Sequence, residues 1–326
     1  MPELPQSAEI LTNNKQRFLK KHLKGSWILL FVLAALWIVL SIATPTFLTY
    51  NNLFNLGRQT AINGVIALGM TFVIVTGGID ISVGSIVAIC SLFLALVLKA
   101  GMPVPLALLL MMLLSILLGL INGIVVFDGN VPPFIATMGM MIVARGIGMV
   151  ISQARLITGL PMDFINFAQE APLGIPSLVI VLGVMAVISG VILHKTSFGR
   201  SIYALGSSRE ATRLSGINIR FITYGAYAIC ALMSGVAAIL LTSRLASGIP
   251  TAGEGYELDA IAAAVVGGAS LNGAEGSIIG TILGAFIMSS LRNGGNLLGL
   301  DPFYLQIVIG ILLVATVIVD QIQKRK

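Results

Sequence analysis

Charged residues are scarce in this sequence. Asp, Glu, Lys and Arg together make up 10% of its 326 residues, whereas 57% of them are hydrophobic. Soluble domains carry roughly 25% charged residues, and so small a polar share cannot cover a globule that is exposed to water. The composition therefore argues against a soluble enzyme, a disordered chain and a secreted disulfide scaffold. Together with a mean hydropathy of +1.00, it indicates a polytopic membrane protein.

Residues that carry redox or metal chemistry are also rare. The two cysteines, Cys90 and Cys230, lie in apolar runs without a C-x-x-C pair, and the two histidines, His22 and His194, stand beside basic clusters. Thiol redox chemistry, structural zinc and a histidine metal site therefore have no support. The sequence contains no G-x-x-x-x-G-K-[ST] motif for ATP and no H-E-x-x-H motif. We expect this chain to be no enzyme and to bind no cofactor or metal of its own.

The net charge of +6 is informative through its placement. Basic residues gather in three groups, each next to an apolar run, whereas a nucleic-acid-binding protein presents them on one folded face. The groups are Lys15, Arg17, Lys20, Lys21 and Lys24; Lys195, Arg200, Arg209, Arg213 and Arg220; and Lys324, Arg325 and Lys326. This pattern is typical of a positive-inside bias. It predicts contact with membrane lipid and no binding of nucleic acid.

Apolar segments close to the length that crosses a bilayer, about 20 residues, recur along the chain. Ten can be assigned, and Gly77-Gly78 and Gly267-Gly268 shorten two of them. The ten are Trp27–Ala43, Thr60–Thr76, Val83–Leu98, Val104–Phe127, Phe134–Ile151, Leu178–Leu193, Ile222–Thr242, Ala260–Val266, Ile278–Leu291 and Tyr304–Val319. We therefore predict an all-α polytopic membrane protein with about ten transmembrane helices. Eight crossings combined with re-entrant segments would fit the same pattern.

The number of crossings and the charge bias agree on the topology. An even number returns the C-terminus to the side of the N-terminus, and the positive-inside bias makes that side the cytoplasm. We expect a cytoplasmic tail at 1–25, one transmembrane domain at 26–320 with a cytoplasmic loop at 194–220, and a cytoplasmic tail at 321–326. A proline-rich loop at Ser152–Pro176 is expected on the opposite side.

Two Gly-Gly pairs interrupt apolar runs, and polar side chains follow each of them. Non-helical backbone at membrane depth is tolerated only where it is buried in protein or lines a cavity, and paired interruptions indicate the substrate pathway of a transporter. Tight turns at the membrane surface explain the pattern equally well, and the likeness of the two segments leaves an internal repeat undecided. The candidate pathway residues are Asn63, Gly77, Gly78, Asp80, Ser82, Thr137, Asn272 and Asn293. Their neutral polar groups suit an uncharged, hydroxyl-rich substrate, although any single one is more often a hydrogen bond between helices.

Arg145 is the one basic residue deep within a predicted span. A charge at that depth is costly, so it normally faces the protein interior or a cavity. We predict that Arg145 pairs with Asp80 or Asp128 as a structural lock, in preference to contacting a substrate.

The polar gap between the sixth and seventh spans contains the pattern of a short helix. Ser207-Ser208-Arg209-Glu210 has the form of a capping box, with Ser at the cap and Glu three residues later. We predict a helix at Ser208–Ser215 that Gly216 ends in a left-handed conformation. Such a helix either docks a soluble partner or lies on the membrane surface, held by anionic lipid.

Three acidic residues, Glu254, Glu257 and Asp259, cluster after the seventh span. The predicted topology places them on the outer face of the membrane. They either help to seat a partner protein there or favour the start of the following helix through its dipole.

Glu210–Gly216 resembles the E-A-A-x-x-x-G loop of bacterial ATP-binding-cassette (ABC) importer permeases, with Thr212 in place of the second Ala. More narrowly, the chain from Asn51 to its end resembles the ribose-type sugar permeases of that class. The stretches that carry the resemblance are Asn51–Asn55, Gly77–Ser85, Gly199–Gly206, Arg213–Asn218 and Pro250–Ala262. No such motif precedes Asn51.

This resemblance implies a fold like that of the type II ABC importers, with ten helices per subunit and a coupling helix between the sixth and seventh. It also implies a homodimer in the bacterial cytoplasmic (inner) membrane, a two-module cytoplasmic ATPase that binds ATP and Mg, and a periplasmic or lipid-anchored sugar-binding protein. The residues that would couple the chain to the ATPase are Gly199, Arg200, Ser208, Arg209, Glu210, Ala211, Arg213, Leu214, Ser215 and Gly216. The acids Glu254, Glu257 and Asp259 would help to seat the binding protein.

The expected function is the import of a monosaccharide, driven by ATP hydrolysis on a partner subunit. The resemblance favours ribose, while hexose and autoinducer carriers share the same motifs. An ion-coupled secondary sugar transporter is the main alternative, but it would need a coupling-ion site, and ionisable residues within the spans are nearly absent. A membrane scaffold or channel would leave the capped cytoplasmic helix unexplained.

Overall fold

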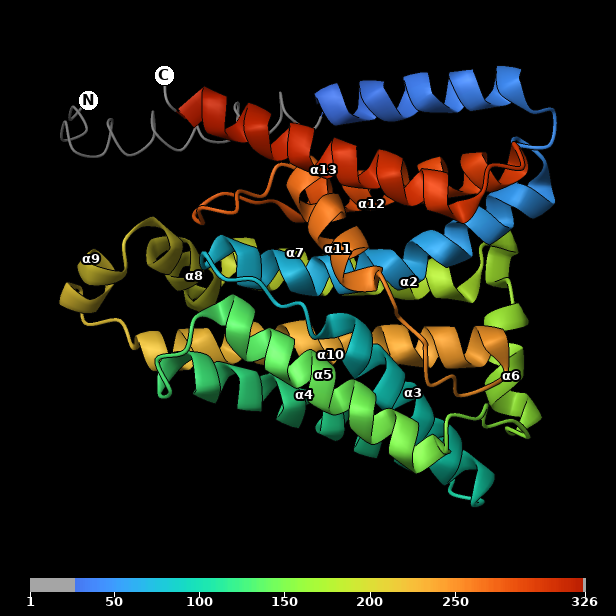
Figure 1. Cartoon of the computed structure of the whole chain (residues 1–326), viewed down its shortest axis with the longest axis horizontal. Helices are drawn as coiled ribbons and strands as arrows, with labels where there is room; N and C mark the ends of the chain where they lie inside the picture. Colours follow the sequence, from blue (N-terminus) through green and yellow to red (C-terminus); the bar gives the residue numbers. More distant parts are fainter. Residues whose placement is uncertain (1–26, 325–326) are drawn as a thin grey trace, which may run out of the picture.

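A computed structural model describes residues 27–324, which fold almost entirely into helices (Figure 1). A helix at Trp27–Ala43 comes first. It is followed by α2 Tyr50–Val75, α3 Val83–Lys99, α4 Val104–Phe127, α5 Pro133–Ser152, α6 Met162–Gln169, the 3₁₀ turn η1 Pro172–Gly174, α7 Ser177–Lys195, α8 Ser197–Ser207, α9 Arg209–Leu214, α10 Ile219–Leu245, α11 Tyr256–Val266, α12 Ile278–Leu297 and α13 Pro302–Lys324. Within residues 27–324 no strand forms, and extended backbone pairs only in one isolated bridge, Ile157 with Gly248.

Each of the ten predicted spans corresponds to one helix, which confirms the all-α fold. Five helices, α2, α4, α5, α7 and α10, are long and apolar enough to cross a membrane, and shorter apolar helices occur at Trp27–Ala43, Val83–Lys99 and Phe303–Ile318. The two remaining spans correspond to α11 and α12. The largest difference is in α2, which begins at Tyr50 and not at Thr60. Polar residues in its first turns, such as Asn55 and Arg58, conceal this part of the helix in the hydropathy of the sequence.

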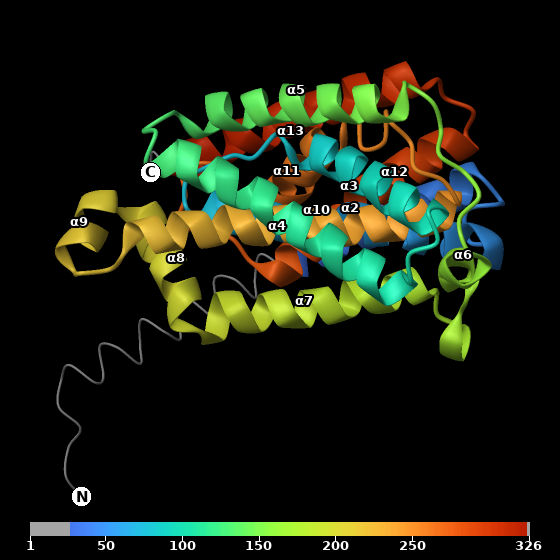
Figure 2. The same cartoon turned by 90° about the horizontal axis from the view of Figure 1, so that it is seen from below.

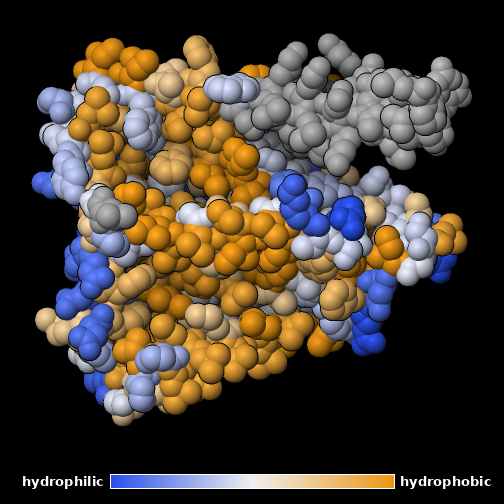
Figure 3. Space-filling model, turned by 180° about the vertical axis from the view of Figure 1, so that it is seen from behind, coloured by the Kyte–Doolittle hydropathy of each residue, from blue (hydrophilic) through white to orange (hydrophobic). Residues whose placement is uncertain are grey.

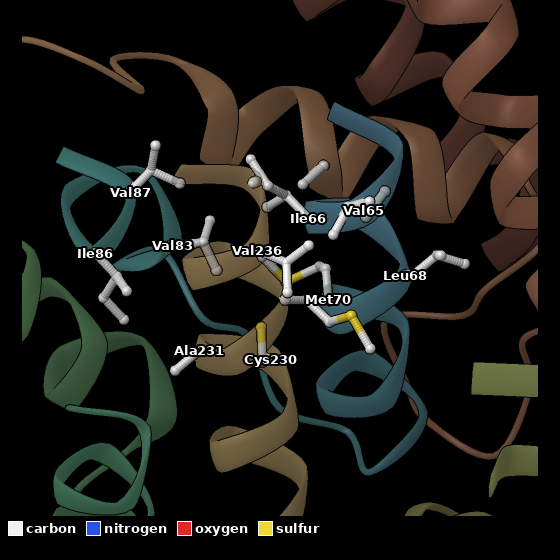
Figure 4. Packing of buried hydrophobic residues seen from close by; sticks show 14 of the residues in the cluster. Val65, Ile66, Leu68, Met70, Val83, Ile86, Val87, Cys230, Ala231 and Val236 are labelled. Atoms are coloured by element: carbon white, nitrogen blue, oxygen red, sulfur yellow. The ribbon is translucent and has the colours of Figure 1, made fainter. Parts of the chain in front are cut away.

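Helices α2 and α10 form the centre of the bundle, with the other helices around them (Figure 1, Figure 2). Met70 of α2, Cys230 of α10 and Val83 of α3 belong to one buried cluster (Figure 4). Gly69 permits the close approach of α2 and α10, because a Cβ there would lie 2.8 Å from the Cβ of Met233 and 3.0 Å from the Cα of Cys230. Small residues hold helices together in this way in lipid, where no hydrophobic driving force acts between them.

A broad apolar belt covers the face of the molecule in Figure 3, and hydrophilic residues gather at both of its ends. Exposed apolar side chains such as Leu109, Val143, Val187 and Ile311 come from α4, α5, α7 and α13. Helices α8 and α9 project at one end of the bundle, and α6 lies at the opposite end (Figure 1). We call these the α9 end and the α6 end. Lipid requires this distribution, since an apolar surface must span the hydrocarbon region between two polar ends.

Two non-helical stretches turn back along the bundle before the next helix begins (Figure 1). We call residues 76–82, after α2, the first return segment, and residues 246–255, after α10, the second return segment. The Gly77-Gly78 pair predicts the first. The sequence does not predict the second, in which Glu254 is the one acidic residue and all residues except Thr251 and Glu254 are at least partly buried. The predicted break at Gly267-Gly268 is present as a third stretch, the 267–277 loop between α11 and α12.

Candidate functional site

Residues 196–218, which we call the α8–α9 arm, project from the α9 end of the bundle. Every helix start in this region has a side-chain cap. The Thr196 Oγ1 accepts from the Gly199 N–H at 3.2 Å, the Ser208 Oγ accepts from the Ala211 N–H at 3.2 Å, and the Asn218 Oδ1 accepts from the Phe221 N–H at 3.1 Å. Capping satisfies backbone donors that the first turn leaves free. These caps give the arm a defined geometry, although it projects from the bundle.

The short helix expected at Ser208–Ser215 is present as α9. Its cap is Ser208 and not Ser207, so the predicted capping box does not form. Glu210 consequently lies at the second helical position, one too early to bond back to the cap, and it pairs instead with Arg213 at 2.7 Å. Gly216 ends the turn with a φ of +75°, which confirms the left-handed conformation predicted for it.

Nine of the ten candidate coupling residues lie on the surface of the arm. They are Arg200, Ser208, Arg209, Glu210, Ala211, Arg213, Leu214, Ser215 and Gly216. The tenth, Gly199, is buried, and a Cβ there would overlap the Leu193 carbonyl oxygen at the turn from α7. Leu214 is 77% exposed at the end of α9. It is a large apolar side chain among polar residues, and its exposure to water does not stabilise the fold. The role of these residues stays a prediction.

The first return segment lies in a cluster of buried polar groups. The Asp80 Oδ1 accepts from the Ser82 N–H at 3.0 Å and from the Ser82 Oγ at 2.5 Å, while the Asn122 Nδ2 of α4 donates to the same Ser82 Oγ at 2.9 Å. From α5, the Thr137 Oγ1 accepts from the Ile81 N–H at 3.2 Å. The structure thus brings together three predicted pathway residues, Asp80, Ser82 and Thr137. Thr137 and Asp80 satisfy the backbone N–H groups of Ile81 and Ser82, directly before α3.

The second return segment is held by Arg145 of α5. Its Nη1 donates to the carbonyl oxygens of Pro250 at 3.2 Å and Ala252 at 3.0 Å. The predicted pairing with Asp80 or Asp128 is therefore wrong, because backbone carbonyls supply the acceptors that the guanidinium needs. Asp128 lies at the α9 end of α4, where Arg220 pairs with it at 2.9 Å and the Tyr224 hydroxyl donates to it.

The second return segment meets the start of α3, directly after the first return segment. A Cβ on Gly84 would overlap the Gly253 carbonyl oxygen and would lie 2.5 Å from the Glu257 Oε2. Gly253 has a φ of +73°, so this contact requires glycine for its backbone conformation as well as for its space. Two parts of the chain that are distant in sequence thus come into direct backbone contact inside the bundle.

The other predicted pathway residues do not gather at one place. Asn293 exchanges two hydrogen bonds with Asn52, at 3.0 and 2.8 Å, which links α12 to the first turn of α2. Asn63 is buried in α2, and its Oδ1 has no hydrogen-bond partner among the described residues. Asn272 is exposed, and its carbonyl oxygen would lie 3.9 Å from a Cβ on Gly77. Gly78 packs against Tyr227, whose hydroxyl oxygen would lie 2.8 Å from a Cβ there.

The three acids expected to seat a binding protein differ in exposure. Glu254 is exposed, with its Oε1 3.9 Å from the Arg145 Nη1. Glu257 is partly buried and accepts from the Gly255 N–H at 3.3 Å. Asp259 is buried and pairs with Arg292 of α12 at 2.6 Å. The sequence analysis missed Arg292 as a partner, although an arginine and an aspartate in neighbouring apolar helices are a signal for such a pair.

The comparison with known proteins agrees with this architecture. A family profile described as "Branched-chain amino acid transport system / permease component" matches residues 52–317. The ribose import permease protein RbsC of Bacillus subtilis is 46% identical over 299 residues, which cover 91% of this chain and 92% of the relative. RbsC of Escherichia coli K12 is 40% identical, covering 92% and 96%, and the D-allose transport system permease protein AlsC of the same strain is 35% identical, covering 90% of each.

No solved structure matches the chain. The resemblance to ribose-type sugar permeases that rests on the sequence motifs is confirmed by the relatives above. Because the profile extends over most of the chain, this protein belongs to the family of membrane permeases described as "Branched-chain amino acid transport system / permease component".

Proposed function

We propose that this chain is the membrane-spanning permease subunit of an ABC importer and that its substrate is a monosaccharide, ribose in the first place. The identity of 46% to a ribose import permease over nine-tenths of both chains carries this proposal. A lower identity of 35% to a D-allose permease agrees with a shared architecture for different sugars.

The α8–α9 arm is the site at which the partner ATPase would dock. Its exposed polar residues surround one exposed apolar side chain, Leu214, and apolar anchors within a polar rim are typical of protein interfaces. ATP and Mg would bind to that partner, and closure of its two modules would pull on the arm. In this proposal the chain itself binds no cofactor.

The orientation follows from the same assignment. With the arm in the cytoplasm, Arg200, Arg209, Arg213 and Arg220 lie on the cytoplasmic side, as the positive-inside bias requires. The helix Trp27–Ala43 then enters from that side and α13 returns to it, so both termini are cytoplasmic. The tail at 1–25 lies outside the described residues, as do Arg325 and Lys326 at the other end. Two copies of the chain would form the translocation pathway between them.

At the opposite face, a sugar-binding protein would deliver the substrate. Of the three candidate acids only Glu254 is exposed, although its carboxylate also lies 3.9 Å from Arg145, so it is the one that we propose contacts the binding protein. The residues along the pathway are proposed from their position beside the return segments: Gly77 and Gly78, Asp80, Ser82 and Thr137, and Asn272. Asn63 and Asn293 complete the proposed set, with Asn293 better explained by its bonds to Asn52.

Ribose uptake into proteoliposomes tests the proposal. The chain is reconstituted with a two-module ABC ATPase and a ribose-binding protein, and uptake is measured with and without ATP for wild type, Gly216→Pro and Glu210→Arg. We expect ATP-dependent uptake in the wild type. Both variants should lose it while still inserting into the membrane, because proline cannot adopt the positive φ of Gly216 and arginine reverses the charge that faces Arg213.

Uptake driven by an ion gradient without ATP would contradict the proposal and favour a secondary transporter. ATP-dependent uptake of another sugar in place of ribose would correct only the substrate. Unaltered uptake in both variants would contradict docking at the arm.

A further inference from the structure

The last turns of α8 lie directly against both Gly-Gly breaks. A Cβ on Gly206 would overlap the carbonyl oxygen of Val75, the last residue of α2, and would lie 2.5 Å from the backbone N of Ala274. A Cβ on Gly273 would lie 3.0 Å from the Gly206 Cα and 3.1 Å from the Gly77 N. Three backbones therefore touch at this point: α8, the end of α2 where it continues into the first return segment, and the 267–277 loop. No side chain separates them.

Two hydrogen bonds fasten the same three parts. The Ala274 N–H donates to the Val75 carbonyl oxygen at 2.9 Å, which links the two breaks to each other. The Tyr203 hydroxyl of α8 donates to the Gly276 carbonyl oxygen at 2.7 Å, which links the arm to the loop. Burial raises the pKa of the Tyr203 phenol, so it stays protonated and able to donate. We call Tyr203, Gly206, Val75, Gly77 and residues 273–276 the glycine junction.

The connection from the tip of the arm to the glycine junction contains no flexible linker. α8 ends at Ser207 and α9 begins at Arg209, so Ser208 alone joins them, and its N–H also bonds to the Ala204 carbonyl oxygen at 3.0 Å. A displacement of α9 must therefore carry the end of α8 with it. Protein interiors are close-packed, so backbones in contact transmit such a displacement with little loss.

One side of the glycine junction has room to move. A cavity of about 260 Å³ lies beside it, lined by residues that include Gly77, Gly78, Leu205, Arg209 and Tyr227. It adjoins the first return segment on one side and the arm on the other. The first return segment therefore borders open space at Gly77 and Gly78, next to its contact with the 267–277 loop.

We propose that the glycine junction couples movement of the α8–α9 arm to both Gly-Gly breaks at once, with Gly206 as the positioning residue. This inference rests on the proposed function, since it assigns a route for the ATPase's pull on the arm. It goes beyond that function in naming one contact through which both broken helices respond together. Neither α8 nor Gly206 touches substrate in this scheme.

The test measures ribose uptake per ATP hydrolysed in proteoliposomes that contain the full complex. The variants are Gly206→Ala and Tyr203→Phe, with Gly183→Ala in α7 as the matched control, because no atom lies within 4 Å of a Cβ there. We expect Gly206→Ala to lower uptake per ATP roughly tenfold, within the range of a typical coupling free energy. Tyr203→Phe should lower it less, because it removes one bond and adds no atoms. Gly183→Ala should match the wild type.

Thermal unfolding of the same variants separates coupling from packing. Tyr203→Phe keeps the test decisive if Gly206→Ala does not fold. Wild-type uptake per ATP in Tyr203→Phe and in any folded Gly206→Ala would overturn the proposal. So would a lowered unfolding temperature in Tyr203→Phe with uptake per ATP unchanged, since the bond would then serve packing only. An absence of ATP-dependent uptake in the wild type would instead refute the proposed function.

Discussion

The first return segment is held by acceptors, whereas the second is held by donors. Before α3 the chain presents the N–H groups of Ile81 and Ser82, which bond to the Thr137 hydroxyl and the Asp80 carboxylate. In the second segment it presents the carbonyls of Pro250 and Ala252, which bond to the Arg145 guanidinium. Backbone groups away from water must find partners within the protein. Each return segment is thus held by side chains that complement its unpaired backbone groups: acceptors where N–H groups are free, and a donor where carbonyl groups are free.

The helices that follow the two segments also differ. α11 carries the buried Asp259, which pairs with Arg292 of α12. Within α3, by contrast, only Lys99 is charged, and it lies at the last residue of the helix. We call the first return segment together with α3 the first unit, and the second return segment together with α11 the second unit. The second unit depends on ionic contacts, while the first depends on neutral packing and hydrogen bonds around one carboxylate. Mutations should affect the two units to different extents.

The largest effect is expected for the ion pair of the second unit. Asp259→Ala leaves the Arg292 guanidinium without its partner at a largely buried place, which costs about 3 to 5 kcal/mol. The matched control is Glu210→Ala, because the pair of Glu210 with Arg213 is exposed and contributes about 0 to 1 kcal/mol. Thermal unfolding in detergent measures both. Equal unfolding temperatures for the two variants would show that the pair does not stabilise α11.

A smaller effect is expected where the two units touch. Gly84→Ala places a Cβ onto the Gly253 carbonyl oxygen, and such overpacking costs about 1 to 3 kcal/mol. Gly190→Ala in α7 is the control, since a Cβ there meets no atom within 4 Å. The free energy of unfolding should fall only in the first variant. If Gly84→Ala were as stable as the wild type, the segments would have to separate easily, and their contact would not constrain the fold.

The smallest effect is expected for the neutral anchor of the first unit. Thr137→Val removes the acceptor of the Ile81 N–H and leaves that partly buried donor without a partner. A buried donor without a partner costs about 1 to 3 kcal/mol, and the lower end is expected here because the burial is partial. Among residues 27–324 the Thr316 hydroxyl bonds within its own helix, to the Leu312 carbonyl at 2.7 Å, so Thr316→Val serves as control. Amide hydrogen exchange at residues 79–82 should quicken in Thr137→Val alone. Unchanged exchange there would mean that Asp80 suffices to hold the segment.

The sequence predicts the helices well because each apolar run is a local property of the chain. It also predicts both Gly-Gly breaks and the left-handed Gly216, since these conformations depend on glycine itself. It fails for Arg145, because matching charges along a sequence does not count backbone carbonyls as acceptors. It does not predict the burial of the second return segment, because Arg145 and Arg292, which pair with Glu254 and Asp259, lie elsewhere in the chain.

The site is predicted less completely than the fold. The exposed arm follows from its polar composition, and its nine candidate positions at 200–216 are all exposed. The sequence predicts Asp80, Ser82 and Thr137 as pathway residues because they are polar and near spans, and in the structure Asp80 and Thr137 accept from backbone N–H groups while the Ser82 hydroxyl donates to Asp80. The contact of Gly206 with Val75 and Ala274 joins three segments far apart along the chain, and no local pattern encodes it.

Helix α5 holds both return segments, through Thr137 for the first and Arg145 for the second. The two side chains are about two helical turns apart, since a turn takes 3.6 residues. A residue inserted or deleted between them would rotate one anchor by about 100° relative to the other. Homologous chains should therefore tolerate substitutions between positions 137 and 145 while keeping the length of this stretch constant. The spacing between Thr137 and Arg145 should therefore be more strongly conserved among homologues than the residues between them.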